Sequence, residues 1–287
     1  MSIVLVTGAS RGIGAYVCRR LHEAGHQVFA GLRDPAGPSA LADLLHEDGM
    51  HGLRLDVRHE GDVESAVARV LDVAGGIDAL INNAGVAWLA PVELQSESTL
   101  QRTMETNFFG AIRMMRAVLP SMRERRRGKI LNISSLAAFH GLPAEAAYCA
   151  SKSALDIASQ SLALEVERFG ISVTSIRPGY TDSGLAVSEV AEDVSRDSDY
   201  EPLLEHLQAL YAQSAEEAES PELVAQAVFD VLRSETPPPC VELGELSIAV
   251  AVVRKGDPKE RLDSIRAVNA LDWWRAGRAQ PTPGETT

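Results

Sequence analysis

The chain has 287 residues, of which 45% are apolar and 5% aromatic, with 27 basic and 40 acidic side chains and a net charge of −13. The excess of acid and the lack of a basic tail argue against a nucleic-acid-binding role, because phosphate binding depends on clustered lysine and arginine. The longest apolar runs are far shorter than the ~20 residues that span a bilayer, so no membrane-spanning helix is expected.

The amino-terminal residues and the cysteines indicate the compartment. Met1 is followed by a short apolar run and glycines, without the basic start and apolar stretch of a secretory signal, so we expect a cytoplasmic protein. Cys18, Cys149 and Cys240 are far apart and form no C-x-x-C pair. We therefore expect neither a disulfide framework nor a metal site.

Short apolar runs alternate along the chain with longer segments of helical period. The runs that we expect to be strands are 3–7, 27–33, 52–56, 79–82, 129–134 and 172–177. The segments that we expect to be helices are 12–25, 38–48, 60–74, 98–126 and 146–169. Parallel strands need long crossovers that cover the sheet, so this alternation predicts an α/β fold with a doubly wound parallel sheet of the Rossmann type, in a single domain.

A glycine-rich turn, TGASRGIG at residues 7–14, joins the first expected strand to the first helix. Glycines at such a turn allow the backbone to approach a pyrophosphate, which the positive helix terminus attracts. The spacing G-x-x-x-G-x-G differs from the commoner G-x-G-x-x-G fingerprint. Between a strand and a helix, it predicts a dinucleotide site rather than a simple corner.

The end of the second strand indicates which dinucleotide is bound. An NAD site has a carboxylate about 20 residues beyond the glycines for the ribose hydroxyls, whereas an NADP site has an arginine. Leu32 stands at the carboxylate position, Arg33 follows it, and Arg11 lies in the glycine loop. Two guanidinium groups suit a 2′-phosphate, so we expect NADP. The alternative is that both arginines are solvated and Asp34 binds the ribose.

A second motif places Tyr148 and Lys152 four residues apart early in an expected helix, with Ser135 upstream, just beyond a strand. Residues four apart share a helix face, so both side chains reach one substrate. A free tyrosine ionises near pH ~10, and a neighbouring ammonium and the oxidised nicotinamide favour the phenolate. Tyr148 then exchanges a proton with the substrate, and Ser135 hydrogen-bonds the substrate oxygen.

Together these motifs resemble the single-domain branch of the short-chain dehydrogenase/reductase family. The matching pieces follow the family's order over residues 1–180, and they are residues 7–14, Asp56-Val57, Asn82-Asn83-Ala84-Gly85, Asn107, Ser135, Tyr148-x-x-x-Lys152 and Arg177-Pro178-Gly179. Within the family, residues 28–35 and 141–152 are most similar to hydroxysteroid and retinol dehydrogenases.

The resemblance implies a role for each matching residue. Tyr148 is the general acid in carbonyl reduction and the base in alcohol oxidation, and Lys152 lowers its pKa and holds the nicotinamide ribose. Ser135 orients the carbonyl, and the Asn107 backbone holds a water that links Lys152 to solvent. Asn82 and Asn83 have the alternative role of tying the central sheet together. The expected cofactor residues are Gly8, Ser10, Arg11, Gly12, Ile13, Gly14, Arg33, Asp56, Val57, Asn83, Ala84, Gly85, Tyr148, Lys152, Pro178, Gly179 and Thr181.

The chain departs from the family pattern just after Pro178-Gly179. The family has an apolar residue two places beyond the glycine and a threonine two places further on, whereas this chain has Thr181 and Ser183. Both hydroxyls can reach the nicotinamide carboxamide, so hydride transfer is still expected. Which of the two binds the carboxamide stays open.

Residues 184–222 resemble the helical flap that covers the substrate in this family. From 189 to 222 they hold eleven carboxylates and one arginine. Such a rim repels phosphorylated substrates, coenzyme A esters and acidic carrier proteins within ~8–10 Å, and it favours neutral or cationic carbonyl compounds. An apolar stripe of this segment, which packs on the domain or lines the pocket, comprises Leu203, Leu204, Leu207, Leu210 and Tyr211.

Two further features have alternative interpretations. Five basic residues between 123 and 129 end an expected helix, where cations complement the helix dipole, and the alternative is docking of an acidic carrier protein. Cys149 is expected to pack in the core rather than to act as a redox-sensitive thiol.

The carboxyl-terminal part begins after Pro237-Pro238-Pro239 with a short strand-like segment. An expected helix at 256–276 then carries Trp273-Trp274. We expect this helix to pack beside the substrate cleft or against another subunit, because an acidic chain is unsuited to a membrane interface. Residues 280–287 are expected to be disordered.

The expected function is that of an NADP(H)-dependent oxidoreductase that transfers hydride between nicotinamide and a carbonyl or secondary alcohol. The expected substrate is neutral and hydrophobic: a ketone, an aldehyde or a steroid-like compound. The alternatives are a β-ketoacyl-thioester reductase and a non-catalytic dinucleotide-binding sensor. The family's pairing of helices such as 98–126 and 146–169 between subunits implies a homodimer or homotetramer.

Overall fold

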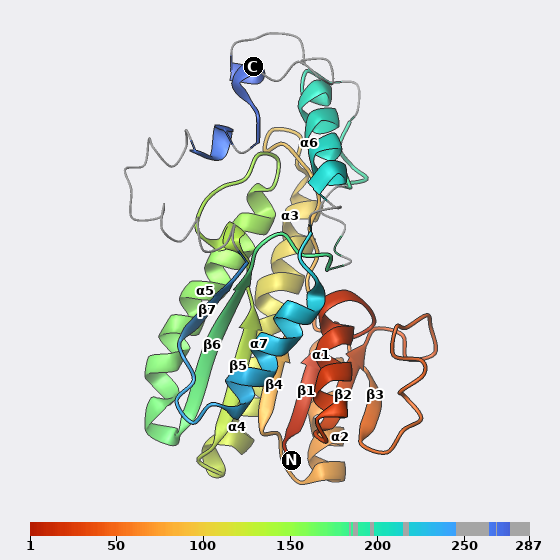
Figure 1. The fold of residues 1–287 in the computed structure, drawn as a ribbon, viewed down its shortest axis with the longest axis vertical. Helices are drawn as coiled ribbons and strands as arrows, with labels where there is room; N and C mark the ends of the chain where they lie inside the picture. The colour runs from red at the N-terminus through yellow and green to blue at the C-terminus, as the bar shows by residue number, and fades with distance from the viewer. Residues whose placement is uncertain are drawn as a thin grey trace.

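A seven-stranded parallel sheet with the order β3-β2-β1-β4-β5-β6-β7 forms the centre of the computed structural model (Figure 1). The structure describes residues 1–183, 185, 189–195, 198–214, 218–244, 264–267 and 269–275. The strands are β1 (Ile3–Thr7), β2 (Gln27–Leu32), β3 (Met50–Arg54), β4 (Ala79–Asn82), β5 (Gly128–Ile133), β6 (Ile171–Pro178) and β7 (Cys240–Leu243). The predicted doubly wound α/β fold is confirmed.

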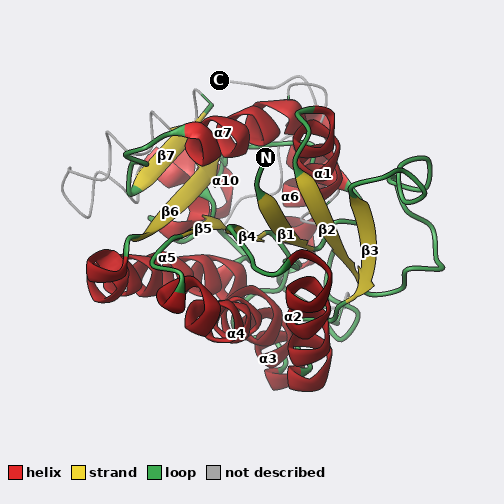
Figure 2. Cartoon of the chain, turned by 90° about the horizontal axis from the view of Figure 1, so that it is seen from below, coloured by secondary structure: helices red, strands yellow, loops and turns green. Residues whose placement is uncertain are grey.

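Helices cover both faces of the sheet (Figure 2). On one face α1 (Gly12–Glu23) packs against α7 (Pro221–Arg233), and on the other lie α2 (Glu60–Ala74), α4 (Gly110–Glu124) and α5 (Ala146–Val166). Successive strand residues point to opposite faces, so Val4 and Val6 belong to the first core and Leu5 to the second. Burial on both faces explains why β1 is continuously apolar from Ile3 to Val6.

The strand order reverses between β1 and β4, which are neighbours at the centre of the sheet. In open α/β sheets, ligands bind in the crevice beyond the carboxyl ends of the strands at this reversal. Residues 8–14 follow β1, residues 83–85 follow β4, and residues 134–135 follow β5. The fold therefore brings the motifs of the sequence to one edge of the sheet.

The single helix predicted over 98–126 is divided into three pieces. They are α3 (Glu97–Met104), a π-helical turn (Glu105–Phe109) and α4. A π-helical turn inserts an extra residue and often marks a functional position. Here it carries Asn107, a residue that is 1% exposed.

The helix predicted over 38–48 is wrong, because this segment forms a series of turns. The apolar spacing that suggested a helix is real, since Leu41 and Leu44 are buried against the first core. Short backbone bonds, such as Leu44 N to Leu41 O at 2.9 Å, close the turns one after another. The leucines thus cover the core without a continuous helix.

Other differences concern boundaries. The strand predicted at 52–56 lies two residues earlier, because Met50 pairs with Val28 of β2. The last residues of the helix predicted over 146–169 form a 3₁₀ turn (Glu167–Phe169), which Gly170 ends with φ 69°. Helix α7 was not predicted. It begins at Pro221, so the last two residues of the predicted flap 184–222 belong to a helix of the body of the protein.

The segment that follows β6 is tied to the body at several points. Thr181 pairs with Glu219 in an isolated bridge, and Leu89 pairs with Val190 in another. Between them lies α6 (Glu201–Ser214), whose Leu203, Leu204 and Leu207 belong to a third core. The packing interpretation of the apolar stripe therefore holds for these three leucines.

Part of the predicted carboxyl-terminal helix is described. Residues 264–267 are helical, α10 (Asp272–Arg275) is a short helix, and the remainder of 256–276 and all of 280–287 lie outside the described residues. The Trp273 ring lies 5.4 Å from the His206 ring of α6, and His206 Nε2 lies 2.9 Å from the Asn269 carbonyl oxygen. The described part of this segment thus packs beside α6.

The basic residues at 123–129 lie near the amino end of β5, at the opposite end of the strand from residues 134–135. Arg125 donates to Asp78 at 2.9 Å, and the Lys129 ammonium donates to the carbonyls of Val231, Leu232 and Ser234 at the end of α7. Both side chains therefore have partners within the chain, and Lys129 complements the dipole of α7 rather than that of the helix that ends here. No helix in the described ranges is long and apolar enough to cross a membrane.

Candidate active site

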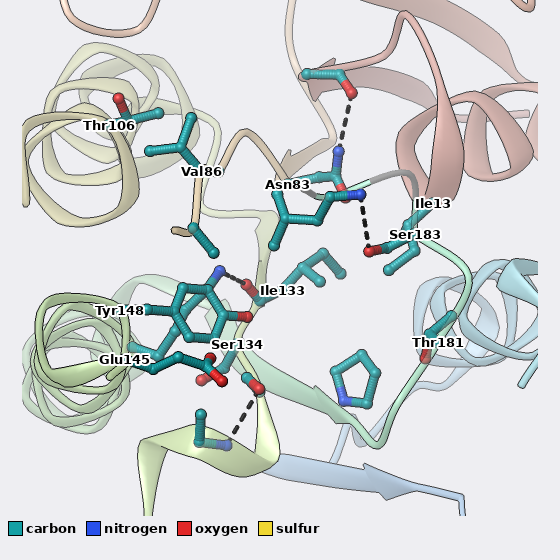
Figure 3. Close-up of a pocket in the computed structure, with 18 of the residues that line it drawn as sticks. Ile13, Asn83, Val86, Thr106, Ile133, Ser134, Glu145, Tyr148, Thr181 and Ser183 are labelled. Carbon is teal, nitrogen blue, oxygen red and sulfur yellow. Dashed lines mark hydrogen bonds between the residues drawn. The ribbon is translucent and has the colours of Figure 1, made fainter. Parts of the chain in front are cut away.

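A cavity of about 1070 Å³ lies at the carboxyl ends of the strands (Figure 3). Three of the predicted site residues, Gly12, Gly14 and Asn107, do not line it. The predicted site residues that line it are Gly8, Ser10, Arg11, Ile13, Arg33, Asp56, Val57, Asn83, Ala84, Gly85, Ser135, Tyr148, Lys152, Pro178, Gly179 and Thr181.

The glycine loop is shaped by close backbone contacts. Gly8 has φ 65°, and a Cβ on it would lie 2.8 Å from the Ala84 Cα. A Cβ on Gly14 would lie 2.3 Å from the Gly8 carbonyl oxygen. Gly14 is therefore required for the packing of α1 on the loop rather than for contact with a ligand, while Gly12 provides a positive φ of 53°.

Thr7 and Asn83 hold this loop against the end of β4. The Thr7 hydroxyl accepts the backbone N–H groups of Asn83 and Ala84, both at 3.0 Å. The Asn83 amide donates to the carbonyls of Thr7 and Gly8. Asn82 Nδ2 donates to Asn132 of β5 at 2.8 Å. Both asparagines thus tie the sheet together, and Asn83 also lines the cavity.

The amino terminus of α1 fits a phosphate group. Its N-cap residue, Arg11, makes no side-chain hydrogen bond to the helix, so within the described residues the first amides of α1 have no side-chain cap. Amides at such a terminus bind phosphate oxygens. The glycines around them leave room for the approach of a pyrophosphate.

The groups near the end of β2 fit a further phosphate. Arg11, Arg33 and Arg58 all line the cavity, whereas Leu32 is buried. Within the described part of the chain, no acidic side chain pairs with Arg11 or Arg33. Asp34 does not line the cavity, and its carboxylate accepts the backbone N–H of Ala36 at 3.0 Å.

Asp56 forms a close ion pair with Arg58. The Arg58 guanidinium holds its carboxylate through two nitrogens, at 2.9 and 2.6 Å, and lowers its pKa to about 2. Arg58 was not among the predicted site residues. Its position two residues after Asp56 was the available signal in the sequence.

Tyr148 and Lys152 lie one turn apart in the first part of α5. The Lys152 ammonium is 5.8 Å from the centre of the Tyr148 ring and donates to the Ile133 carbonyl at 2.8 Å (Figure 3). Burial lowers the pKa of Lys152 to about 8, although Asp156 opposes this effect. The lysine is thus aimed across the end of β5 towards the cavity.

Burial raises the pKa of the Tyr148 hydroxyl above its usual value, and a hydrogen bond with the Ser135 side chain opposes the rise. The Ser135 hydroxyl also accepts the Ala137 N–H at 3.1 Å, which orients it. The protein's own groups therefore keep Tyr148 protonated, unlike the phenolate-favouring effect expected of Lys152.

Asn107 and Lys152 both lie close to Gly85. A Cβ on Gly85 would be 3.5 Å from Asn107 Oδ1 and 3.8 Å from Lys152 Nζ, so both atoms border the same small space. The Asn107 side chain accepts the Val86 N–H at 2.8 Å and donates to the Val86 carbonyl and to Ser151, both at 2.9 Å. These bonds fix the π-helical turn to the strand end.

A buried ionic cluster holds α5 to β6. Arg177 donates to Asp156 at 2.6 Å and to Glu242 at 3.1 Å, and its guanidinium lies 4.3 Å from the centre of the Phe139 ring. Asp156 is one helical turn beyond Lys152. The cluster therefore positions α5, the helix that carries Tyr148 and Lys152, relative to the sheet.

Several lining residues were not predicted from the sequence, among them Glu145, Tyr180 and Arg102. Glu145 precedes Tyr148 by three residues, which is helical spacing and was the available signal. Leu210 and Tyr211 of the apolar stripe also line the cavity. Both interpretations of the stripe are thus correct for different members.

The hydroxyl-bearing residues after Gly179 both line the cavity (Figure 3). The Thr181 hydroxyl donates to the Gly179 carbonyl at 3.2 Å, and the Ser183 hydroxyl accepts the Leu185 N–H at 3.3 Å. Cys149, by contrast, is buried, and burial raises the pKa of its thiol to about 12. Such a thiol is inert, which favours core packing over a redox role.

Comparisons with known proteins agree with this site. Residues 2–194 match the family model for short chain dehydrogenases. The chain is 35% identical to a 3-ketodihydrosphingosine reductase of Bacteroides thetaiotaomicron, over 85% of this chain and 88% of the relative. It is 32% identical to estradiol 17-beta-dehydrogenase 1 of Rattus norvegicus, over 82% and 72% of the two chains.

A solved structure is similar as well. A short chain dehydrogenase from Burkholderia cenocepacia, crystallised in complex with NADP, is 25% identical, with a TM-score of 0.73 over 92% of this chain and 97% of the other. The family match, the sheet order and the glycine loop agree with one another. The chain is therefore an oxidoreductase that belongs to the short-chain dehydrogenase family, whose members bind NAD or NADP.

Proposed function

We propose that the protein transfers hydride between NADP(H) and the carbonyl or secondary alcohol of a substrate with an apolar body. The observation that carries this proposal is the meeting of Tyr148, Lys152 and Ser135 with the glycine loop in one cavity. A bound dinucleotide supplies the hydride and, when oxidised, a positive ring. The residues of this chain supply the proton, the orientation and the exclusion of water.

In this proposal Tyr148 gives its proton to the carbonyl oxygen as the alcohol forms, and takes it back in oxidation. Burial raises its pKa, so the hydroxyl holds its proton before the substrate binds, and the Lys152 ammonium and the oxidised nicotinamide then favour release of that proton. The Ser135 hydroxyl donates to the same substrate oxygen, where negative charge grows. Lys152 has two N–H groups besides the one bound to Ile133, and these hold the nicotinamide ribose. The neighbouring Asn107 turn holds the water that returns the proton from solvent.

The choice of NADP rests on charge at the end of β2. Arg11 and Arg33 line the cavity without an acidic partner among the described residues, and Asp34 does not line it. Planar guanidinium groups bind phosphate oxygens in pairs. The NADP complex of the Burkholderia relative supports the same choice.

The choice of an apolar substrate is based on the apolar side chains that line the cavity, which include Leu142, Leu185, Leu210 and Ile265. The relatives named for 3-ketodihydrosphingosine and for estradiol support a ketone or an alcohol as the reacting group. We also propose that the protein is cytoplasmic and that it forms a homodimer or a homotetramer.

The test is NADPH oxidation with a panel of long-chain ketones, aldehydes and steroid ketones. We expect turnover of at least one class, with NADPH preferred to NADH. Binding of the dinucleotide without turnover of any compound would instead favour the non-catalytic sensor. Salt-sensitive turnover of acyl-carrier-bound β-ketoesters alone would favour the thioester reductase.

A further inference from the structure

Glu145 is a buried carboxyl within the substrate part of the cavity. Its residue is 3% exposed, yet it lines the cavity beside Tyr148 (Figure 3). Burial raises its pKa to about 7, although a hydrogen bond from Tyr211 opposes the rise. Taking a carboxylate out of water is costly unless a partner compensates.

The position of Glu145 in the helix does not explain this cost. It is the N-cap residue of α5, where the short side chains of Ser, Thr, Asp or Asn ordinarily accept the free amides of the first turn. Here the side chain makes no capping hydrogen bond. The carboxyl points instead towards α6, where the Tyr211 hydroxyl donates to Oε1.

The carboxyl also has no cationic partner. Among the described residues, no lysine, arginine or histidine pairs with Glu145, and Tyr211 provides its side-chain hydrogen bond. A carboxylate has about four acceptor sites, so most of them are free to receive a ligand. An ion pair with a ligand would supply the missing compensation.

The surroundings favour a cation. The Tyr180 and Tyr211 rings lie 5.9 Å apart and line the same part of the cavity, and ring faces attract ammonium groups. Two further carboxylates, those of Glu189 and Glu219, also line the cavity, and they raise the local concentration of cations.

We infer that Glu145 binds a protonated amine of the substrate, so that the preferred compounds are long-chain amino ketones and amino alcohols. Glu145 and Tyr148 are three residues apart on one helix, where Cβ atoms lie about 5–6 Å from each other. Both side chains line one cavity, so an amine at Glu145 and a carbonyl at Tyr148 belong to the same end of the substrate. This inference rests on the proposed function and narrows its substrate to one with a positive charge near the carbonyl.

The first test compares three alcohols in the direction of oxidation: 1-amino-2-dodecanol, 1,2-dodecanediol and 2-dodecanol. We expect kcat/KM of the wild type to be higher for the amino alcohol than for 2-dodecanol by about tenfold or more, as hydrogen bonds between charged groups provide. The diol is expected to resemble 2-dodecanol. Equal values for the amino alcohol and 2-dodecanol, or a preference for the diol, would overturn the inference.

Glu145→Gln is the matched variant, because its amide oxygen still accepts the Tyr211 hydroxyl while its charge is gone. It is expected to lose the preference for the amine, so that kcat/KM for the amino alcohol falls by about tenfold towards the value for 2-dodecanol. Glu222→Gln removes a charge from the exposed start of α7, outside the cavity, and is expected to keep the preference. An equal loss on all three alcohols in Glu145→Gln would show that the carboxyl only braces α6.

A binding measurement separates this inference from the proposed function. Octylammonium and octanol are titrated calorimetrically into the full chain saturated with NADP. We expect tighter binding of octylammonium in the wild type and equal binding in Glu145→Gln. Amine binding without turnover of any alcohol would overturn the proposed function alone, whereas turnover without an amine preference would overturn this inference alone.

Discussion

The two sides of the cavity are built on different principles. On the side where we propose that the cofactor binds, two side chains close to the strand ends, those of Thr7 and Asn83, bond to backbone groups of the loop 8–14 and of residues 83–84. On the substrate side, side chains from distant segments make the contacts, as Tyr211 does with Glu145, 66 residues away. The first side depends on chain geometry and the second on individual side chains.

This difference shows which properties each side can change. A glycine loop of this kind tolerates few substitutions, because a methyl group at Gly8 or Gly14 would meet backbone atoms. A substrate site made of exchangeable side chains can alter its preference by single replacements. The predictions below test this division, beginning with the residue where the two sides meet.

Tyr148→Phe is expected to give the largest effect, a loss of kcat of about 100-fold or more, because the proton donor is removed. The affinity for NADPH should stay nearly unchanged, since the cofactor side is intact. Steady-state kinetics and a fluorescence titration with NADPH measure the two quantities. Tyr16→Phe, at an exposed position of α1, is the control. Survival of activity in Tyr148→Phe would show that another group donates the proton.

Arg33→Ala is expected to weaken NADPH binding by about tenfold or more, as loss of a charged hydrogen bond to phosphate does. Binding of NADH, which lacks the 2′-phosphate, should change far less. The dissociation constants of both dinucleotides measure the difference, with Arg116→Ala on the exposed face of α4 as the control. An equal loss for both dinucleotides would contradict a phosphate role for Arg33.

Gly14→Ala is expected to destabilise the protein by about 1–3 kcal/mol, because the new methyl group meets the Gly8 carbonyl and the Asn83 amide. Gly61→Ala is the control, since open space surrounds that position at the start of α2, and alanine there should stabilise the helix by up to about 1 kcal/mol. Urea unfolding of both variants provides the comparison. Equal stability of the two would mean that the loop adapts easily.

Glu145→Gln is expected to show a smaller, pH-dependent gain of stability. Between pH 4.5 and about 7 the folded protein keeps a proton that the unfolded chain has released, so the free energy of unfolding of the wild type falls as pH rises. The variant avoids this loss and should be more stable at pH 8 by about 1–3 kcal/mol, with little difference at acid pH. Urea unfolding at both pH values measures the difference, with Glu222→Gln as the control. A gain of stability that is the same at both pH values would contradict this expectation.

The sequence predicted the cofactor side well because its motifs are local. Residues 7–14 carry their own turn geometry, and Tyr148 and Lys152 share a face through helical spacing alone. The same locality explains the failure at 38–48, where apolar spacing reported burial of Leu41 and Leu44 but not the backbone that achieves it.

The substrate side was less predictable because its contacts join segments that are far apart in the chain. Nothing near Glu145 indicates that Tyr211 will meet it, and nothing near His206 indicates Asn269. The π-helical turn at Asn107 also escaped prediction, since the periodicity of 98–126 continues through it. Such features depend on packing between elements rather than on the pattern of one element.

The bridge between Thr181 and Glu219 has a consequence for how new enzymes of this type arise. Glu219 N donates to the Tyr180 carbonyl at 3.0 Å, and Asp182 N donates to the Glu219 carbonyl at 3.0 Å. The two ends of the segment between them are therefore joined to each other by backbone hydrogen bonds. Lengthening a loop whose ends are already joined costs little entropy, about 0.6 kcal/mol per doubling. A change of length between residues 183 and 218 therefore leaves the sheet and the glycine loop joined as they are, so the substrate side of the cavity can vary while the other side is kept.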